Sequence, residues 1–125
     1  MRQTAKLKKP KISTIKNKLD KHWRDKVKEK KFCEICGRKE NLNAHHIIGR
    51  RNLNLRWDLR NLCVLCPYCH TFGINSAHQN PLFFLDWMKK HRPDDLKYLQ
   101  KKQYEPPCPL KVEDLLIKLN KLRGR

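Results

Sequence analysis

Residues 33–37 read CEICG, residues 44–50 read AHHIIGR and residues 61–70 read NLCVLCPYCH. The first and last of these stretches each contain two cysteines separated by two residues. Such a pair forms a tight turn that presents two thiolates, and two pairs complete the tetrahedral ligand set of a structural zinc ion. The four predicted zinc ligands are Cys33, Cys36, Cys66 and Cys69.

Cys63 offers an alternative, because it also stands three residues before Cys66. It lies within the apolar run at residues 62–65, where a free cysteine behaves as a small hydrophobic residue. We therefore favour Cys66 and Cys69 as the second pair. Cys108 stands alone in a proline-rich segment, and we assign it no role.

The composition leaves room for only a small core. Of 125 residues, 38% are hydrophobic and 34% are charged. Zinc therefore matters for folding, since structural zinc sites contribute on the order of 10 kcal/mol or more. No apolar run is long enough to cross a membrane, and no apolar segment follows the basic N-terminus as in a secretion signal. We read the six cysteines as reduced, in a cytoplasmic protein without a membrane partner.

The formal net charge is +18, from 30 Lys and Arg against 12 Asp and Glu. Half of this charge lies in residues 1–30. A chain this basic favours a polyanionic partner, and we expect DNA, duplex or branched. Residues 1–12 hold almost no large apolar side chains, which predicts a flexible basic arm.

A helix is predicted after this arm. Large apolar side chains recur every fourth residue from Ile15 to Val27, and Ser13 could cap the helix. In the middle of the chain, residues 42–48 and 61–65 predict two short strands, with an arginine-rich stretch between them.

The C-terminal third returns to helical patterns. Asn80-Pro81 predicts the start of a helix that runs to residue 91, and Pro93 starts another. Beyond a proline-rich linker at residues 103–110, residues 111–125 predict an amphipathic helix. This helix could pack on its own domain or on a second copy, so monomer and homodimer both stay open.

Together these patterns predict a small, zinc-stabilised α+β fold. We expect its main domain at residues 13–102, with the core motif at residues 33–78. The order of the motifs resembles that of the HNH endonucleases: a cysteine pair, two adjacent histidines, an asparagine, and a cysteine pair followed directly by histidine. The resemblance implies a ββα-metal fold, in which a hairpin and a helix hold one catalytic divalent ion.

The resemblance also implies roles for individual residues. His45 and His70 would bind the catalytic ion. His46 would be the general base that takes a proton from the attacking water, and Asn61 would hydrogen-bond and orient its ring. This chemistry is sound, because phosphodiester hydrolysis needs a base that titrates near neutral pH and a cation beside the phosphate.

The sequence departs from the family pattern at Ile74, where some relatives carry a further metal ligand. His78 is our candidate for that third ligand. Adjacent strand residues point to opposite faces, so His45 and His46 predict a bulge or a strand end if both are to reach one site. A narrower likeness to the NinG type of phage recombination proteins implies the cytoplasm of a phage's host.

Four arginines between the predicted strands could clamp the DNA backbone, since guanidinium groups match phosphate oxygens in pairs. They are Arg50, Arg51, Arg56 and Arg60. The alternative is that Arg56 or Arg60 pairs with Asp58.

The sequence thus predicts a metal-dependent DNA endonuclease of weak sequence specificity. It would contain structural Zn²⁺ and catalytic Mg²⁺, or another divalent ion such as Mn²⁺ or Ni²⁺. Two alternatives stay open: a non-catalytic zinc module that binds nucleic acid, and a nuclease that acts on branched recombination intermediates.

Overall fold

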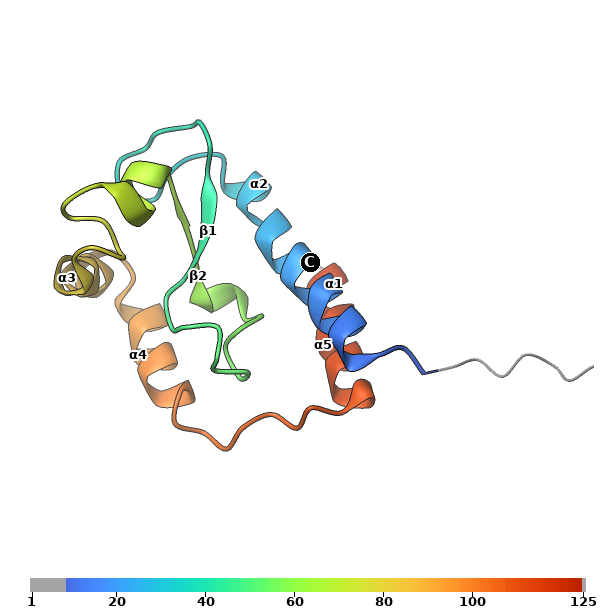
Figure 1. Cartoon of the computed structure of the whole chain (residues 1–125). Coiled ribbons are helices and arrows are strands. Elements are labelled where there is room, and N and C mark those ends of the chain that lie inside the picture. The colour runs from blue at the N-terminus through green and yellow to red at the C-terminus, as the bar shows by residue number, and fades with distance from the viewer. Residues whose placement is uncertain (1–8, 125) are drawn as a thin grey trace, which may run out of the picture.

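A two-stranded antiparallel hairpin has the helices from the two ends of the chain on one side and two further helices on the other (Figure 1). A computed structural model describes residues 9–124, so most of the predicted basic arm lies outside the described residues. Strand β1, Asn43–His46, pairs with β2, Leu62–Leu65, and no residue is skipped in the register. Both predicted strands are confirmed, each slightly shorter than the run that indicated it.

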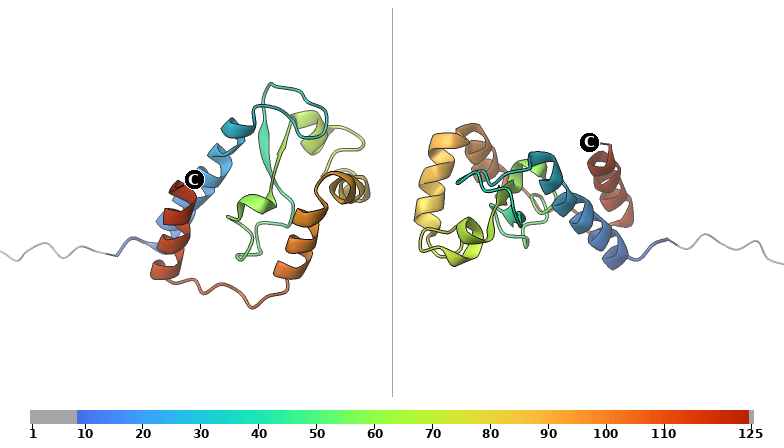
Figure 2. Two further views of the ribbon diagram at one scale, coloured as in Figure 1. Left: turned by 180° about the vertical axis from the view of Figure 1, so that it is seen from behind. Right: turned by 90° about the horizontal axis from the view of Figure 1, so that it is seen from above.

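The first helical layer joins the two ends of the described chain. Helix α1, Ile12–Asp25, packs against α5, Val112–Arg123, and the single turn α2, Val27–Lys30, follows α1 (Figure 2). The apolar face of α5 is thus covered within its own chain. The buried side chains of this pair are Ile15, Leu19, Trp23, Leu115, Leu119 and Leu122.

The predicted cap of the first helix is wrong. Lys11 occupies the N-cap position without a side-chain hydrogen bond, and Ser13 lies inside the first turn. The apolar repeat indicates which residues face the core, but packing against α5 lets the helix begin two residues earlier than the serine indicated.

The second helical layer covers the other face of the hairpin. Helix α3, Pro81–His91, begins as predicted, with the Asn80 side chain accepting a hydrogen bond from Phe83 N. Helix α4, Pro93–Lys102, follows directly. Their apolar side chains pack with Cys63 and Leu65 of β2, whereas Leu62 packs with the α1–α5 layer. Alternate hairpin residues therefore face different layers, as the two-residue period of a strand requires.

The remaining segments connect these layers. A 3-10 turn, Leu59–Asn61, leads into β2, and a π-helical turn, Tyr68–Phe72, follows it. Asn54 ties the loop between the strands to the proline-rich linker, since its Nδ2 donates to the carbonyls of Glu105 and Pro106. No helix in the described part of the chain is long and apolar enough to cross a membrane.

Candidate metal centres and active site

The four predicted zinc ligands lie together. The Sγ atoms of Cys33, Cys36, Cys66 and Cys69 all lie within 4.8 Å of one another, a spacing that a tetrahedral zinc ion can bridge. Gly37 follows the first pair with φ of 81°, which glycine adopts without steric cost. Cys63 lies outside this group and is buried in the core, as a small hydrophobic residue.

The environment of Cys33 favours the thiolate that zinc needs. Burial acts to raise its pKa, but hydrogen bonds from the backbone around its sulfur outweigh this and bring the pKa to about 7. A thiol that ionises near neutral pH is a ready metal ligand.

Three histidines form a second group. His45 projects from β1, His70 lies in the π-helical turn, and His78 lies in the loop that follows. One ring nitrogen of each lies within 4.8 Å of the others, and the Nε2 atoms of His70 and His78 are 3.1 Å apart. The structure thus brings the candidate third ligand, His78, beside the two that the family pattern implied.

A loop, rather than a helix, carries His78 to this position. The π-helical turn ends at Phe72, and an added Cβ on the next residue, Gly73, would lie 2.8 Å from the carbonyl oxygen of Tyr68. The chain then returns, because Ala77 N donates to the Cys69 carbonyl and His78 N donates to the His70 carbonyl. The main chain itself therefore sets the distance between the two histidines.

Asn43, which was not among the predicted site residues, orients one of the three rings. Its Oδ1 lies 3.1 Å from His70 Nδ1. Because an amide oxygen only accepts, His70 carries its proton on Nδ1 and directs Nε2 into the group, an arrangement typical of metal-binding histidines. Asn43 stands two residues before His45 on the same strand face, and that spacing could have indicated it.

His45 is held in the uncharged form. Burial, and then the neighbouring His70 and His78, lower its pKa to about 3. An uncharged imidazole is the form that coordinates a metal ion. The three-histidine group can therefore hold a divalent cation at neutral pH.

His46 lies on the opposite face of β1. The register contains no bulge, and His46 is the last residue of the strand. Its ring stacks on Trp23 of α1, with centroids 3.8 Å apart, and its Nε2 lies 3.0 Å from the carbonyl oxygen of Arg56. The strand therefore directs His45 toward α3 and His46 toward α1.

The contact with Arg56 defines the tautomer of His46. A carbonyl oxygen only accepts, so the uncharged ring carries its proton on Nε2 and has its lone pair on Nδ1. Among residues 9–124, no group hydrogen-bonds this Nδ1. A ring in this state can accept a proton.

Asn61 does not orient the His46 ring as expected. Its side-chain oxygen accepts from Ile48 N at 2.7 Å, and its Nδ2 donates to the carbonyls of Ile48 and Leu55. Asn61 is fully buried and can satisfy its amide only with backbone groups of the loop. It holds the segment that follows His46 and does not contact the ring.

Three of the four predicted DNA clamps make ion pairs within the protein. Arg56 is buried and makes two hydrogen bonds to Asp20, while Arg60 pairs with Asp95 and lies over the Tyr98 ring. A paired, buried guanidinium is not available to phosphate, so this expectation for Arg56 is wrong. The alternative ion pair between Asp58 and Arg56 or Arg60 is also replaced, because Arg56 pairs with Asp20 and Arg60 pairs with Asp95. Arg50, Arg51 and Arg60 are exposed, and Arg50 Nη2 also lies 3.6 Å from Asp20 Oδ2.

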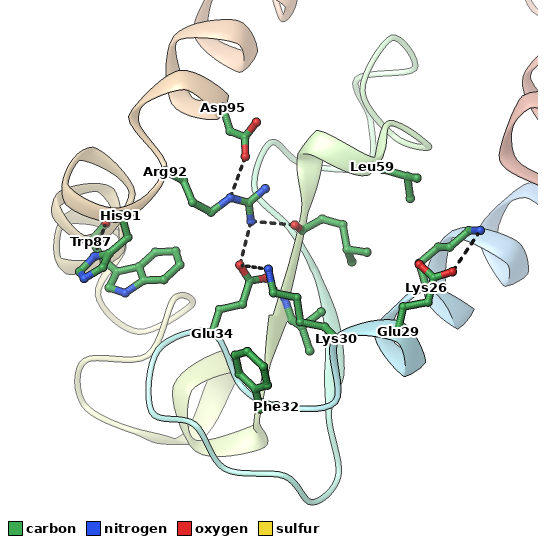
Figure 3. A pocket seen from close by; sticks show the side chains of 12 residues that line it. Lys26, Glu29, Lys30, Phe32, Glu34, Leu59, Trp87, His91, Arg92 and Asp95 are labelled. Atoms are coloured by element: carbon green, nitrogen blue, oxygen red, sulfur yellow. Dashed lines mark hydrogen bonds and ion pairs between the residues drawn. The ribbon is translucent and has the colours of Figure 1, made fainter. Parts of the chain in front are cut away.

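A separate hollow of about 580 Å³ lies beside β2 and contains none of the predicted site residues (Figure 3). Arg92 at its wall donates to the Leu62 carbonyl and pairs with Asp95 and Glu34. Glu34 in turn accepts from Val64 N. These charges neutralise one another and close the outer edge of β2, so we assign the hollow no ligand.

Comparison with known families agrees with this geometry. The HNH endonuclease family model matches residues 33–72, from the first cysteine to the end of the π-helical turn. This segment is similar to the HNH endonucleases, as the order of motifs predicted. Searches of curated proteins and of solved structures found no match. The likeness to the NinG type stays a prediction.

Proposed function

We propose that the protein is a metal-dependent endonuclease that hydrolyses phosphodiester bonds in DNA. The observation that carries the proposal is the convergence of His45, His70 and His78 in a chain that matches the HNH family. A divalent ion bound there would stabilise negative charge on the phosphate and the leaving oxygen. Imidazole suits Ni²⁺ or Zn²⁺ better than Mg²⁺ and Mn²⁺, which prefer oxygen ligands. We therefore place Ni²⁺ ahead of Mg²⁺ and Mn²⁺ among the predicted ions.

His46 is the proposed general base. Its free Nδ1 can take a proton from the attacking water while Nε2 stays bonded to the Arg56 carbonyl. His45 and His46 leave β1 on opposite faces, and within residues 9–124 β1 has a partner strand on one side only. We place the scissile phosphate along the open edge of β1, where groups from both faces can reach it.

The rest of the domain supports this site. The cysteine group, filled with zinc, would hold both ends of the hairpin region, because its two pairs flank the strands in sequence. The net charge of +18 supplies affinity for the DNA backbone. Arg50 and Arg51 are the loop cations that we propose to contact phosphate.

A plasmid-cleavage assay tests the proposal. Supercoiled DNA is incubated with zinc-loaded protein and Ni²⁺, Mn²⁺, Mg²⁺ or EDTA, with wild type beside His46→Ala and the exposed control His91→Ala. We expect metal-dependent nicking by wild type and control, and a loss of about 10²–10⁴ in rate for His46→Ala. If folded wild type cuts neither plasmid nor branched DNA, the non-catalytic nucleic-acid-binding module is the better account.

A further inference from the structure

Helix α1 precedes the segment that matches the HNH family, yet it contacts the proposed base. The Trp23 indole is buried and stacks on the His46 ring, with an angle of 12° between the planes. Its Nε1 donates to the carbonyl of Asp58 at 3.0 Å. The indole is thus fixed at both its face and its edge, and it limits rotation of the imidazole.

Asp20, one turn earlier on α1, fixes the other contact of His46. Its two oxygens accept from Arg56 Nε at 3.0 Å and Nη2 at 2.8 Å, and Oδ1 also accepts from Trp57 Nε1 at 2.8 Å. These three bonds immobilise residues 56 and 57. The carbonyl of Arg56 is the group that accepts from His46 Nε2.

We infer that Asp20 and Trp23 are positioning residues that keep His46 in one orientation and in the tautomer with a free Nδ1. The inference rests on the proposed nuclease function of His46. Asp20 acts through the Arg56 backbone, and Trp23 acts through the stacked ring; neither contacts the metal-binding histidines in the described structure. The catalytic unit therefore extends beyond the HNH segment to include α1.

A structural role alone would have different consequences. The Arg56 carbonyl remains in every side-chain variant, so a change at Asp20 acts on the His46–Arg56 hydrogen bond by altering where that carbonyl lies. Without a fixed acceptor at Nε2, an uncharged imidazole carries its proton on either nitrogen. Loss of Asp20 should then change the tautomer of His46 as well as the stability of the fold.

The experiment compares Asp20→Asn with the matched control Asp95→Asn in the full-length, zinc-loaded protein. Asp95 also joins two arginine Nε atoms, at 2.7 Å from Arg60 and 2.9 Å from Arg92, but contacts neither His46 nor α1. The readouts are the melting temperature, the imidazole ¹⁵N resonances of His46 measured well below it, and the single-turnover cleavage rate at saturating DNA. The His46 resonances are assigned with a His46→Gln spectrum.

We expect both variants to have a lower melting temperature than wild type. Only Asp20→Asn should bring the two ¹⁵N shifts of His46 together, as tautomers interconvert, and slow cleavage by about tenfold or more. Unchanged His46 resonances and rate in folded Asp20→Asn would overturn the inference while leaving the nuclease proposal intact.

Trp23→Phe and Trp23→Leu provide a second comparison that stands even if Asp20→Asn does not fold. Phe can still stack on His46 and should largely keep the wild-type resonances and rate, whereas Leu should lose both. Equal behaviour of the two variants would count against a positioning role for the ring. If wild type cleaves no DNA, the nuclease proposal fails, but the ¹⁵N resonances still decide whether α1 positions His46.

Discussion

The Nε2 atoms of His70 and His78 lie 3.1 Å apart, although eight residues separate the two histidines. A continuous α-helix from His70 would turn His78 to a different side. The helix instead ends after one π-helical turn, and the chain folds back. Main-chain hydrogen bonds then join residues 77 and 78 to residues 69 and 70.

This relationship predicts that His78 contributes to metal affinity. With the cysteine site filled by zinc, His78→Ala should bind Ni²⁺ or Co²⁺ at least about tenfold more weakly than wild type, because one of three ligands is lost. His91→Ala removes an exposed histidine elsewhere and should bind normally. Isothermal titration measures both affinities, and equal binding by the two variants would exclude His78 as a ligand.

The two cysteine choices predict different zinc contents. Cys66→Ala removes a member of the four-cysteine group and should lose zinc and most of the folded structure. Cys63→Ala should keep one equivalent of zinc, because Cys63 is buried in the core and is not a member of the four-cysteine group. Metal analysis of the purified proteins distinguishes them, and zinc loss from Cys63→Ala would contradict the assignment.

Helix α5 should stabilise the domain through α1. Leu119 is buried between the two helices, so Leu119→Ala should lower the free energy of unfolding by about 2–5 kcal/mol. Ile117, on the exposed side of the same helix, serves as the control, and Ile117→Ala should change it by about 0.5 kcal/mol or less. Urea denaturation provides both values; equal effects would mean that α5 does not pack on α1 in solution.

The ionised carboxylate of Asp95 should stabilise the fold, and this contribution should be lost at acidic pH. Burial acts to raise its pKa, but hydrogen bonds from Arg60 and Arg92 outweigh this and hold it below the ordinary value. A lowered folded-state pKa stabilises the protein above the unfolded-state pKa of about 4, and this contribution disappears as pH falls through the folded-state value. The stability gap between wild type and Asp95→Asn should therefore be full at pH 6 and shrink below about pH 4. A gap independent of pH would show that the carboxylate charge is not involved.

The sequence by itself determined which candidate metal-binding and catalytic residues are present and the order in which they occur along the chain. The spacing within each cysteine pair is a local property, so the four-cysteine group, the two strands and the likeness to the HNH family could be predicted from residues 33–70. The start of α3 was equally clear, because Asn80 and Pro81 act within one helical turn.

Only the tertiary structure decided how the remaining groups meet. The partner of Arg56 is Asp20, 36 residues away, and nothing in the loop sequence distinguishes it from the nearer Asp58. The Asn61 side chain hydrogen-bonds to the backbone of the loop, and the His46 ring stacks on Trp23. Burial leaves each polar side chain only the partners that the packed chain supplies. Contacts across such sequence distances depend on the whole fold, whereas spacing and local turns depend only on neighbouring residues.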